Sequence, residues 1–160
     1  MNILCLTGTN PYSFERLVSS VDVVLGPKYN VSIQLGNTNY KPNFAKSFVF
    51  CSRDEMLHLI KSSDIIITQG GFGSISDALS FGKKIIAVPR LMKLNECQDN
   101  QTEIVNYYAK KQYLVSCYDV TKLEEIILDL LNDKIVLLPF VPESEIKISD
   151  IISNYIKSFN

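Results

Sequence analysis

The sequence has no excess of charge of either sign and no long hydrophobic run. Its 160 residues carry 16 lysines and arginines against 17 aspartates and glutamates, so the formal net charge is −1. Because no basic stripe is interleaved with aromatic residues, we do not expect nucleic acid as a partner. No segment approaches the roughly 18 consecutive apolar residues that a membrane-spanning helix needs. Any association with a membrane is therefore expected to run through a partner or a surface.

Glycine, proline and cysteine are also scarce. Seven glycines and six prolines in a chain that is 46% hydrophobic exclude a fibrous or disordered protein and indicate one globular domain over residues 1–160. The four cysteines lack metal-ligand spacing, and Cys5 and Cys51 lie in apolar strand contexts where a reduced thiol packs as a small hydrophobe. Residues 1–7 have no basic flank and no small-residue cleavage site, so we expect a first strand rather than a signal peptide. These features favour a cytoplasmic protein.

Short apolar runs alternate with longer segments of helical period, which is typical of βαβ units that form a parallel sheet. Six strands are expected, at about residues 2–7, 30–35, 46–51, 64–68, 85–88 and 113–117. Helices are expected at about residues 12–23, 53–62, 73–81, 100–111 and 121–132, the last with Thr121 as its N-cap. The turn-forming stretch 36–44 replaces a crossover helix. The predicted fold class is α/β, a Rossmann-like parallel sheet of about six strands flanked by helices, with 3-2-1-4-5-6 as the candidate strand order.

The last part of the chain differs from this alternation. Two prolines within residues 137–142 forbid a helix there, and an amphipathic helix is expected over residues 143–159. Its apolar residues form one stripe: Ile148, Ile151, Ile152, Tyr155, Ile156 and Phe159. The stripe fits two functions, because an amphipathic helix covers its own domain in the ordinary case but can also bind a partner.

The strongest local motif is a glycine-rich turn between a buried strand and a helix, Gly70-Gly71-Phe72-Gly73-Ser74-Ile75. Glycines let a ligand approach the main chain closely, and the free N–H groups of the following helix attract a diphosphate, to which Ser74 can add a hydroxyl donor. The spacing matches neither the G-x-G-x-x-G fingerprint nor the lysine-bearing P-loop. Neither a dinucleotide oxidoreductase nor an ATPase is therefore favoured. On its own, such a turn is as often purely structural.

A second glycine turn, Thr7-Gly8-Thr9, follows the first strand. If strands one and four are neighbours, both turns open into the same crevice at their carboxyl ends. A plain strand-to-helix turn remains an equal alternative for residues 7–10.

A third segment at a carboxyl edge begins with Arg90, where a proline ends the fifth strand, and continues into a polar loop over residues 95–103. Its amides and carboxylates suit sugar and ribose hydroxyls, although a solvated loop that caps the next helix is the simpler alternative. The one histidine, His58, has no evident partner and is expected to be an ordinary helix residue.

In combination these motifs resemble the C-terminal domain of glycosyltransferase family 28, in its short stand-alone form. The resemblance runs from Ile3 to about Val115 and rests on Thr7-Gly8-Thr9, Phe14, Gly71-x-Gly73-Ser74-Ile75, Leu79, Gly82-Lys83, Val88-Pro89-Arg90 and the loop 96–103. In such domains the glycine turn binds the donor diphosphate. The family's loop usually has a His-Gln pair followed by Glu, so Gln101 inherits contacts to donor-sugar hydroxyls while Asn100 stands where His is usual. Gln69-Gly70 likewise stand where His-Ala is more usual.

The resemblance implies one half of a GT-B glycosyltransferase that binds a UDP-sugar and needs a membrane-associated partner subunit with a lipid-linked glycan acceptor. The expected reaction is inverting transfer in polysaccharide biosynthesis, such as capsule formation, at the cytoplasmic face of a membrane. No metal or other cofactor is obligatory, since no DxD-like motif is evident. Two alternatives stay open: a regulatory subunit without catalysis, and a nucleotide-binding module without transfer.

The candidate site residues fall into two groups. Expected donor-binding residues are Thr7, Gly8, Thr9, Gly71, Phe72, Gly73, Ser74, Ile75, Arg90, Asn100 and Gln101. Candidates for proton transfer or donor contacts are Glu96, Asp99 and Glu103.

Overall fold

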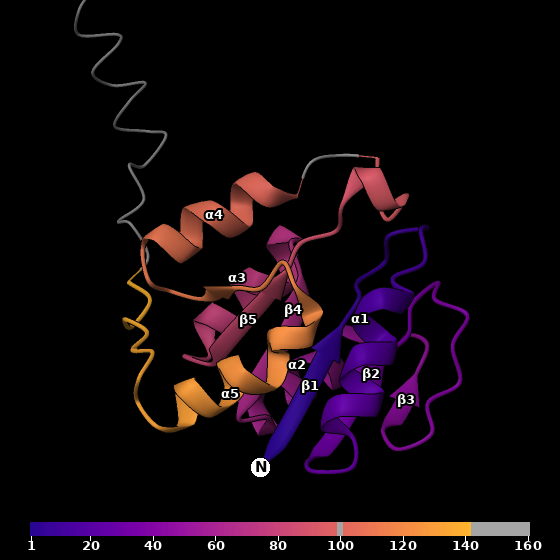
Figure 1. The fold of residues 1–160 in the computed structure, drawn as a ribbon, viewed down its shortest axis with the longest axis horizontal. Helices are drawn as coiled ribbons and strands as arrows, with labels where there is room; N and C mark the ends of the chain where they lie inside the picture. Colours follow the sequence, from indigo (N-terminus) through magenta and orange to yellow (C-terminus); the bar gives the residue numbers. More distant parts are fainter. Residues whose placement is uncertain (99–100, 142–160) are drawn as a thin grey trace, which may run out of the picture.

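A computed structural model describes residues 1–98 and 101–141. Six parallel strands form one sheet in the order β3-β2-β1-β4-β5-β6 (Figure 1). The strands are β1 Asn2–Leu6, β2 Asn30–Gln34, β3 Lys46–Phe48, β4 Ile65–Gln69, β5 Lys84–Val88 and β6 Val115–Ser116. The predicted fold class and strand order are confirmed.

The central strands of the sheet are covered on both faces by helices. Every residue of β4 is buried, and its register places Ile65 beside Ile3 of β1 and Ile66 beside Ile85 of β5. A run of β-branched residues without alternation is what a parallel strand with two covered faces requires. At its carboxyl end this run meets the glycine turn.

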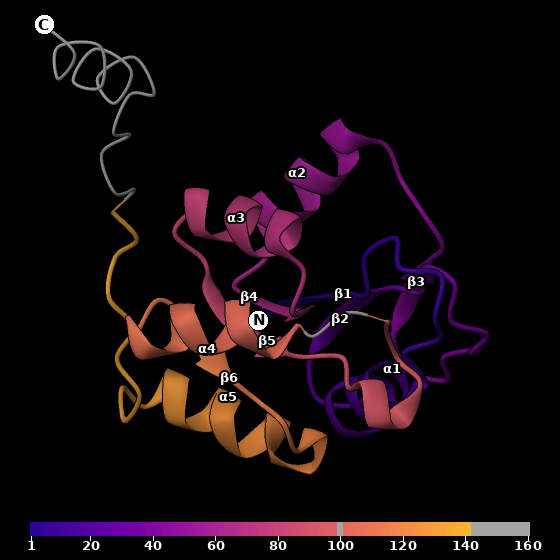
Figure 2. The same cartoon turned by 90° about the horizontal axis from the view of Figure 1, so that it is seen from above.

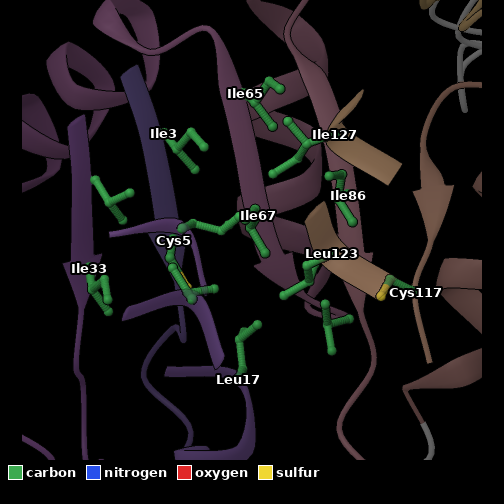
Figure 3. Packing of buried hydrophobic residues seen from close by; sticks show 14 of the residues in the cluster. Ile3, Cys5, Leu17, Ile33, Ile65, Ile67, Ile86, Cys117, Leu123 and Ile127 are labelled. Atoms are coloured by element: carbon green, nitrogen blue, oxygen red, sulfur yellow. The ribbon is translucent and has the colours of Figure 1, made fainter. Parts of the chain in front are cut away.

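Helices cover the sheet on both faces, as the view from above shows (Figure 2). They are α1 Glu15–Ser20, α2 Arg53–Ser62, α3 Phe72–Ser80, α4 Thr102–Lys110 and α5 Leu123–Leu131. One face packs against α1, the π-helical turn Val21–Leu25 that continues it, and α5, where Leu17, Leu123 and Ile127 meet Ile3 and Ile67 (Figure 3). The other face packs against α2, α3 and α4 through Ile60, Ile75 and Val105.

Several predicted boundaries shift, and one predicted cap is wrong. The first helix begins at Glu15 rather than near residue 12, and the third and sixth strands are shorter than expected. Thr121 does not cap α5. Instead, the Asp119 carboxylate accepts hydrogen bonds from the Thr121 backbone N–H (3.0 Å) and hydroxyl (2.7 Å), which starts a 3₁₀ turn ahead of the helix. The helix expected over residues 143–159 lies outside the described residues.

The stretch 36–44 links β2 to β3 without a helix, as predicted, and Asp22 holds its end in place. The buried Asp22 carboxylate accepts hydrogen bonds from the backbone N–H groups of Asn43 (2.8 Å), Phe44 (3.0 Å) and Ala45 (2.8 Å), and from the Tyr40 hydroxyl (3.1 Å). Burial by itself raises the pKa of Asp22, but these hydrogen bonds stabilise the carboxylate and hold its pKa below the usual value.

Replacing Asp22 by Asn should lower the free energy of unfolding by about 2 kcal/mol, because one acceptor oxygen and the charge that strengthens the remaining bonds are lost. A carboxyl group with a lowered folded pKa contributes stability above its unfolded pKa and loses it as pH falls through the folded pKa. The difference between Asp22→Asn and wild type in urea unfolding should therefore shrink below about pH 4. Asp54→Asn, at an exposed position of α2, is the matched control and should change little. Equal stability of Asp22→Asn and wild type at pH 7 would contradict this assignment.

Candidate functional site

The loops after β1, β4 and β5 open at the carboxyl edge of the sheet, where α4 lies across the top of the domain in the view of Figure 1. Two close approaches bring these loops together. A Cβ atom placed on Gly8 would overlap Nε2 of Gln69, and one placed on Gly70 would lie 2.8 Å from both Cβ and the carbonyl oxygen of Gln101. The glycines at positions 8 and 70 are therefore needed for packing between loops.

The turn between β4 and α3 has the geometry of an anion site. Gly71 is the N-cap of α3, and among residues 1–98 and 101–141 no side-chain hydrogen bond caps this helix end. The first N–H groups of a helix have no partner within the helix, so those of Phe72, Gly73 and Ser74 are available to a ligand at its positive dipole end. Gly73 is exposed, and a Cβ atom there would have no neighbour within 4 Å. Packing does not require glycine at that position, whereas close approach of a ligand to the backbone would. Ile75 is instead buried in the core.

Gln101 lies directly beside this turn as the N-cap of α4. Within the described residues, its buried Oε1 atom has no hydrogen-bond partner. An orphaned acceptor of this kind costs free energy unless water or a ligand donates to it. Glu103, in the first turn of α4, is exposed and lines a shallow pocket of about 370 Å³ with Phe72, Ile104, Tyr107 and Tyr108. The structure thus brings Gln101 and Glu103 together with the glycine turn.

The loop after β1 reaches the same edge, but its side chains differ in availability. Thr7 is buried and its hydroxyl donates to the Gln34 carbonyl oxygen (2.9 Å). The Gly8 N–H donates to Gln34 Oε1 (3.0 Å), and its φ of +70° suits glycine. Thr9 is exposed. Of the three, Thr9 has its side chain in position to meet a ligand.

Arg90 is turned into the protein rather than toward a ligand. It is 1% exposed, and its guanidinium donates to the carbonyl oxygens of Thr7 (3.0 Å), Tyr12 (2.9 Å), Ser13 (3.1 Å) and Glu96 (3.0 Å), and to Oε1 of Gln69. It also lies 4.3 Å from the centre of the Phe14 ring. Burial lowers the pKa of Arg90 to about 10, which leaves it charged at neutral pH. Arg90 therefore joins the loops after β1, β4 and β5.

Glu96 is likewise occupied by the protein. It is 5% exposed, and its carboxylate accepts from Nε (2.8 Å) and Nη2 (2.9 Å) of Arg16 and from the backbone N–H of Leu91 (2.9 Å). Both oxygens of the Glu96 carboxylate are thus occupied by donors of the protein. Of the three candidates for proton transfer, Glu103 is the one that the structure places at the surface, while Asp99, like Asn100, lies outside the described residues.

Two residues of this edge were missed by the sequence analysis as contributors. Gln69, the last residue of β4, sits between the glycine turns, and Arg16 of α1 neutralises Glu96. A glutamine closing an apolar strand directly before a glycine turn was a usable signal for the first. The Arg16 contact spans 80 residues and has no local signature.

The described part of the chain does not have what a metal site or a membrane-spanning helix requires. No three His, Cys, Asp or Glu side chains lie there in a group that could hold a metal ion. His58 is exposed on α2. Among the same residues, no helix combines the length and apolar character needed to cross a bilayer.

The chain belongs to the glycosyltransferase family 28 C-terminal domain family, whose profile matches residues 2–153. This confirms the family that the motifs indicated. A comparison with curated proteins gave no match.

Solved structures extend the likeness at the level of the fold. The chain is similar to the glycotransferase of kitacinnamycin (TM-score 0.65, 13% identity), with 84% of this chain and 36% of that chain covered. It is also similar to ALG13 (TM-score 0.60, 20% identity, 87% and 89% covered) and to UDP-GlcNAc 2-epimerase from Neisseria meningitidis bound to UDP-GlcNAc (TM-score 0.60, 12% identity, 98% and 44% covered). The chain spans about a third of the length of the kitacinnamycin enzyme. Its match with ALG13 extends over 87% of this chain and 89% of that one.

Proposed function

We propose that this chain is the donor-binding, catalytic subunit of a two-component inverting glycosyltransferase that uses a UDP-sugar. The observation that carries the proposal is the position of Gln101, whose Cβ and carbonyl oxygen pack against Gly70 just before the N-cap of α3, and whose buried Oε1 atom has no hydrogen-bond partner among the described residues. The helix end suits the diphosphate, and the glutamine suits a sugar hydroxyl next to it. A nucleotide sugar presents these two groups side by side.

The reaction requires a second protein component. In inverting transfer an acceptor hydroxyl attacks the anomeric carbon, the bond to UDP breaks, and the hydroxyl proton passes to a base. The backbone N–H groups at the start of α3 stabilise the negative charge that develops on the departing UDP. The chain covers the length of ALG13 but about a third of the kitacinnamycin enzyme. In line with the resemblance to the short stand-alone form of the family, we assign the acceptor site to a membrane-associated partner that binds a lipid-linked glycan in polysaccharide biosynthesis and recruits this chain to the cytoplasmic face.

Within this chain, Glu103 is our candidate for proton transfer or for a further donor contact. Its side chain is exposed in the first turn of α4, two residues after Gln101. Glu96 contributes indirectly, because its ion pair with Arg16 and its bond to the Leu91 N–H hold the loop after β5.

The proposal is tested by thermal unfolding of the purified chain with UDP, ADP, GDP and a panel of UDP-sugars. A ligand at 100 times its dissociation constant stabilises the native state by about 2.7 kcal/mol, which is readily measured. Selective stabilisation by uridine compounds is the expected result. Stabilisation by ADP or GDP instead would favour a nucleotide-binding module, and no stabilisation in either the chain alone or the complex with its co-expressed partner would leave a regulatory subunit.

Replacing Gln101 by Ala should weaken binding of the UDP-sugar roughly 10-fold, since one hydrogen bond to the sugar is lost, and leave binding of UDP itself nearly unchanged. Isothermal titration with both ligands measures the difference. Gln112→Ala, an exposed glutamine just after the C-terminal end of α4, is the matched control and should bind both ligands as wild type does. Equal loss of affinity for UDP and UDP-sugar in Gln101→Ala would show that Gln101 shapes the turn rather than reads the sugar.

A further inference from the structure

The side-chain amide of Gln69 is bonded at its oxygen, while its nitrogen Nε2 has no hydrogen-bond partner among the described residues. Gln69 is 7% exposed, and its Oε1 atom accepts a hydrogen bond from Nε of Arg90. A guanidinium carries donors and no acceptor, so the amide atom that faces Arg90 must be the oxygen. Arg90 thereby fixes which way the amide is turned, and Nε2 points to the opposite side.

Nε2 of Gln69 lies between the two glycine turns of the site. It would overlap a Cβ atom on Gly8 and would lie 3.1 Å from one on Gly71. Among the described residues, the bond from Arg90 is the only hydrogen bond that the Gln69 side chain makes. An amide nitrogen carries two N–H donors. Nε2 of Gln69 is not one of the described atoms that are both fully buried and unpartnered, so it is open to solvent between the loop after β1 and the start of α3. A ligand acceptor that approaches there can replace water on these two donors.

Arg90 cannot itself supply a contact to a ligand in that space. Arg90 is 1% exposed, and both of its Nη atoms donate to carbonyl oxygens of the loops after β1 and β5, namely those of Thr7, Tyr12, Ser13 and Glu96. The Phe14 ring packs on its plane. The guanidinium of Arg90 is thus fixed by main-chain atoms of the loops after β1 and β5, and the Gln69 amide that it binds is fixed with it.

We propose that Arg90 is a positioning residue of the donor site, which holds Gln69 so that Nε2 donates a hydrogen bond to a phosphate oxygen of the bound nucleoside diphosphate. This rests on the proposed function, because the phosphate is that of the UDP moiety. The bound diphosphate lies between Nε2 of Gln69 and the backbone N–H groups of Phe72, Gly73 and Ser74. Gln69 is accordingly a neutral donor to an anion, while the charge of Arg90 stays inside the protein.

Two substitutions of Gln69 separate this role from a purely structural one. Gln69→Glu keeps an oxygen for the Arg90 bond and replaces the Nε2 donor by a second oxygen, whereas Gln69→Met removes the donor without adding charge. Both should lower UDP affinity in isothermal titration roughly 10-fold or more, the Glu variant further, because a hydrogen bond to a charged group is lost. Binding of uridine, which has no phosphate, should be unchanged, and Gln112→Met, at an exposed position just after the far end of α4, is the matched control for both ligands.

Nuclear magnetic resonance supplies a readout that a structural role would not move. The side-chain amide signals of Gln69, assigned by their loss in Gln69→Met, should shift when UDP is added and stay in place with uridine. In Arg90→Lys, studied at a temperature where it is folded, no Nε–H reaches Oε1, so the same signals should move to a solvent-like position and UDP affinity should fall with uridine affinity retained. This result is specific for an orienting contact.

The outcomes also separate this inference from the proposed function. If the wild-type chain binds no uridine compound, alone or with its partner, the proposed function fails. If it binds UDP, while Gln69→Met binds UDP equally well and the Gln69 amide signals do not respond, the donor site stands and the role of Arg90 and Gln69 is overturned.

Discussion

Gly73→Val is expected to abolish UDP binding, with at least a 100-fold loss of affinity, in a chain that folds as wild type does. Apart from its own helix backbone, a Cβ atom at this position meets no atom of the described residues within 4 Å, so the valine side chain projects into the space where the ligand would approach the start of α3. It would separate the diphosphate from the backbone N–H groups by more than hydrogen-bond distance. Isothermal titration with UDP, together with urea unfolding, measures both halves of this expectation.

Stability should not fall in Gly73→Val, because valine has the better helix propensity of the two by about 0.5 kcal/mol. Glycine in a helix costs about 1 kcal/mol relative to alanine, and valine costs roughly half of that. Gly73→Ala should give an intermediate affinity. Ser80→Val, at the exposed last residue of the same helix, introduces the same side chain away from the turn and should bind UDP normally. Unchanged UDP affinity in Gly73→Val would mean that the phosphates do not contact this end of α3.

The parts of the fold that follow from local signals could be predicted. The apolar run ending at Gln69 identifies a strand with two covered faces, and the following glycines identify its turn. The predicted helix 53–62 coincides with α2, whose start is set by the reciprocal hydrogen bonds of Ser52 and Glu55. In these cases the cause lies within a few residues of its effect. The strand order 3-2-1-4-5-6 is the candidate order assumed for a Rossmann-like sheet, and the structure has it.

What could not be predicted depends on contacts between distant segments. The first helix begins late because the Phe14 N–H donates to Thr38 Oγ1 and the preceding carbonyls of Tyr12 and Ser13 accept from Arg90. A helix that began near residue 12 would need the carbonyl oxygens of Tyr12 and Ser13 for its own hydrogen bonds. Arg90 and Glu96, read as ligand contacts from their place at the carboxyl edge, find protein partners that lie up to 83 residues away. The direction in which a charged side chain turns is set by such partners and not by its neighbours in sequence.

Arg90→Met should lower the free energy of unfolding by at least about 4 kcal/mol or leave no folded state at all. Methionine fills a similar volume, but it removes the donor to the buried carbonyl groups of Thr7 and Glu96, to the part-buried ones of Tyr12 and Ser13, and to the Gln69 Oε1 atom. Unsatisfied buried acceptors each cost about 1–3 kcal/mol, and here they belong to the loops that form the site. Urea unfolding compares the variant with wild type.

Arg53→Met is the matched control for the loss of an arginine. Arg53 is exposed on α2 and pairs with Asp77 of α3, and exposed ion pairs contribute little to stability. Its substitution should leave both the unfolding transition and UDP binding close to wild type. If Arg90→Met were as stable as Arg53→Met, the carbonyl groups of Thr7, Tyr12 and Ser13 would have to find water in its place. The loops after β1 and β5 would then be held without Arg90, and its burial would need another cause.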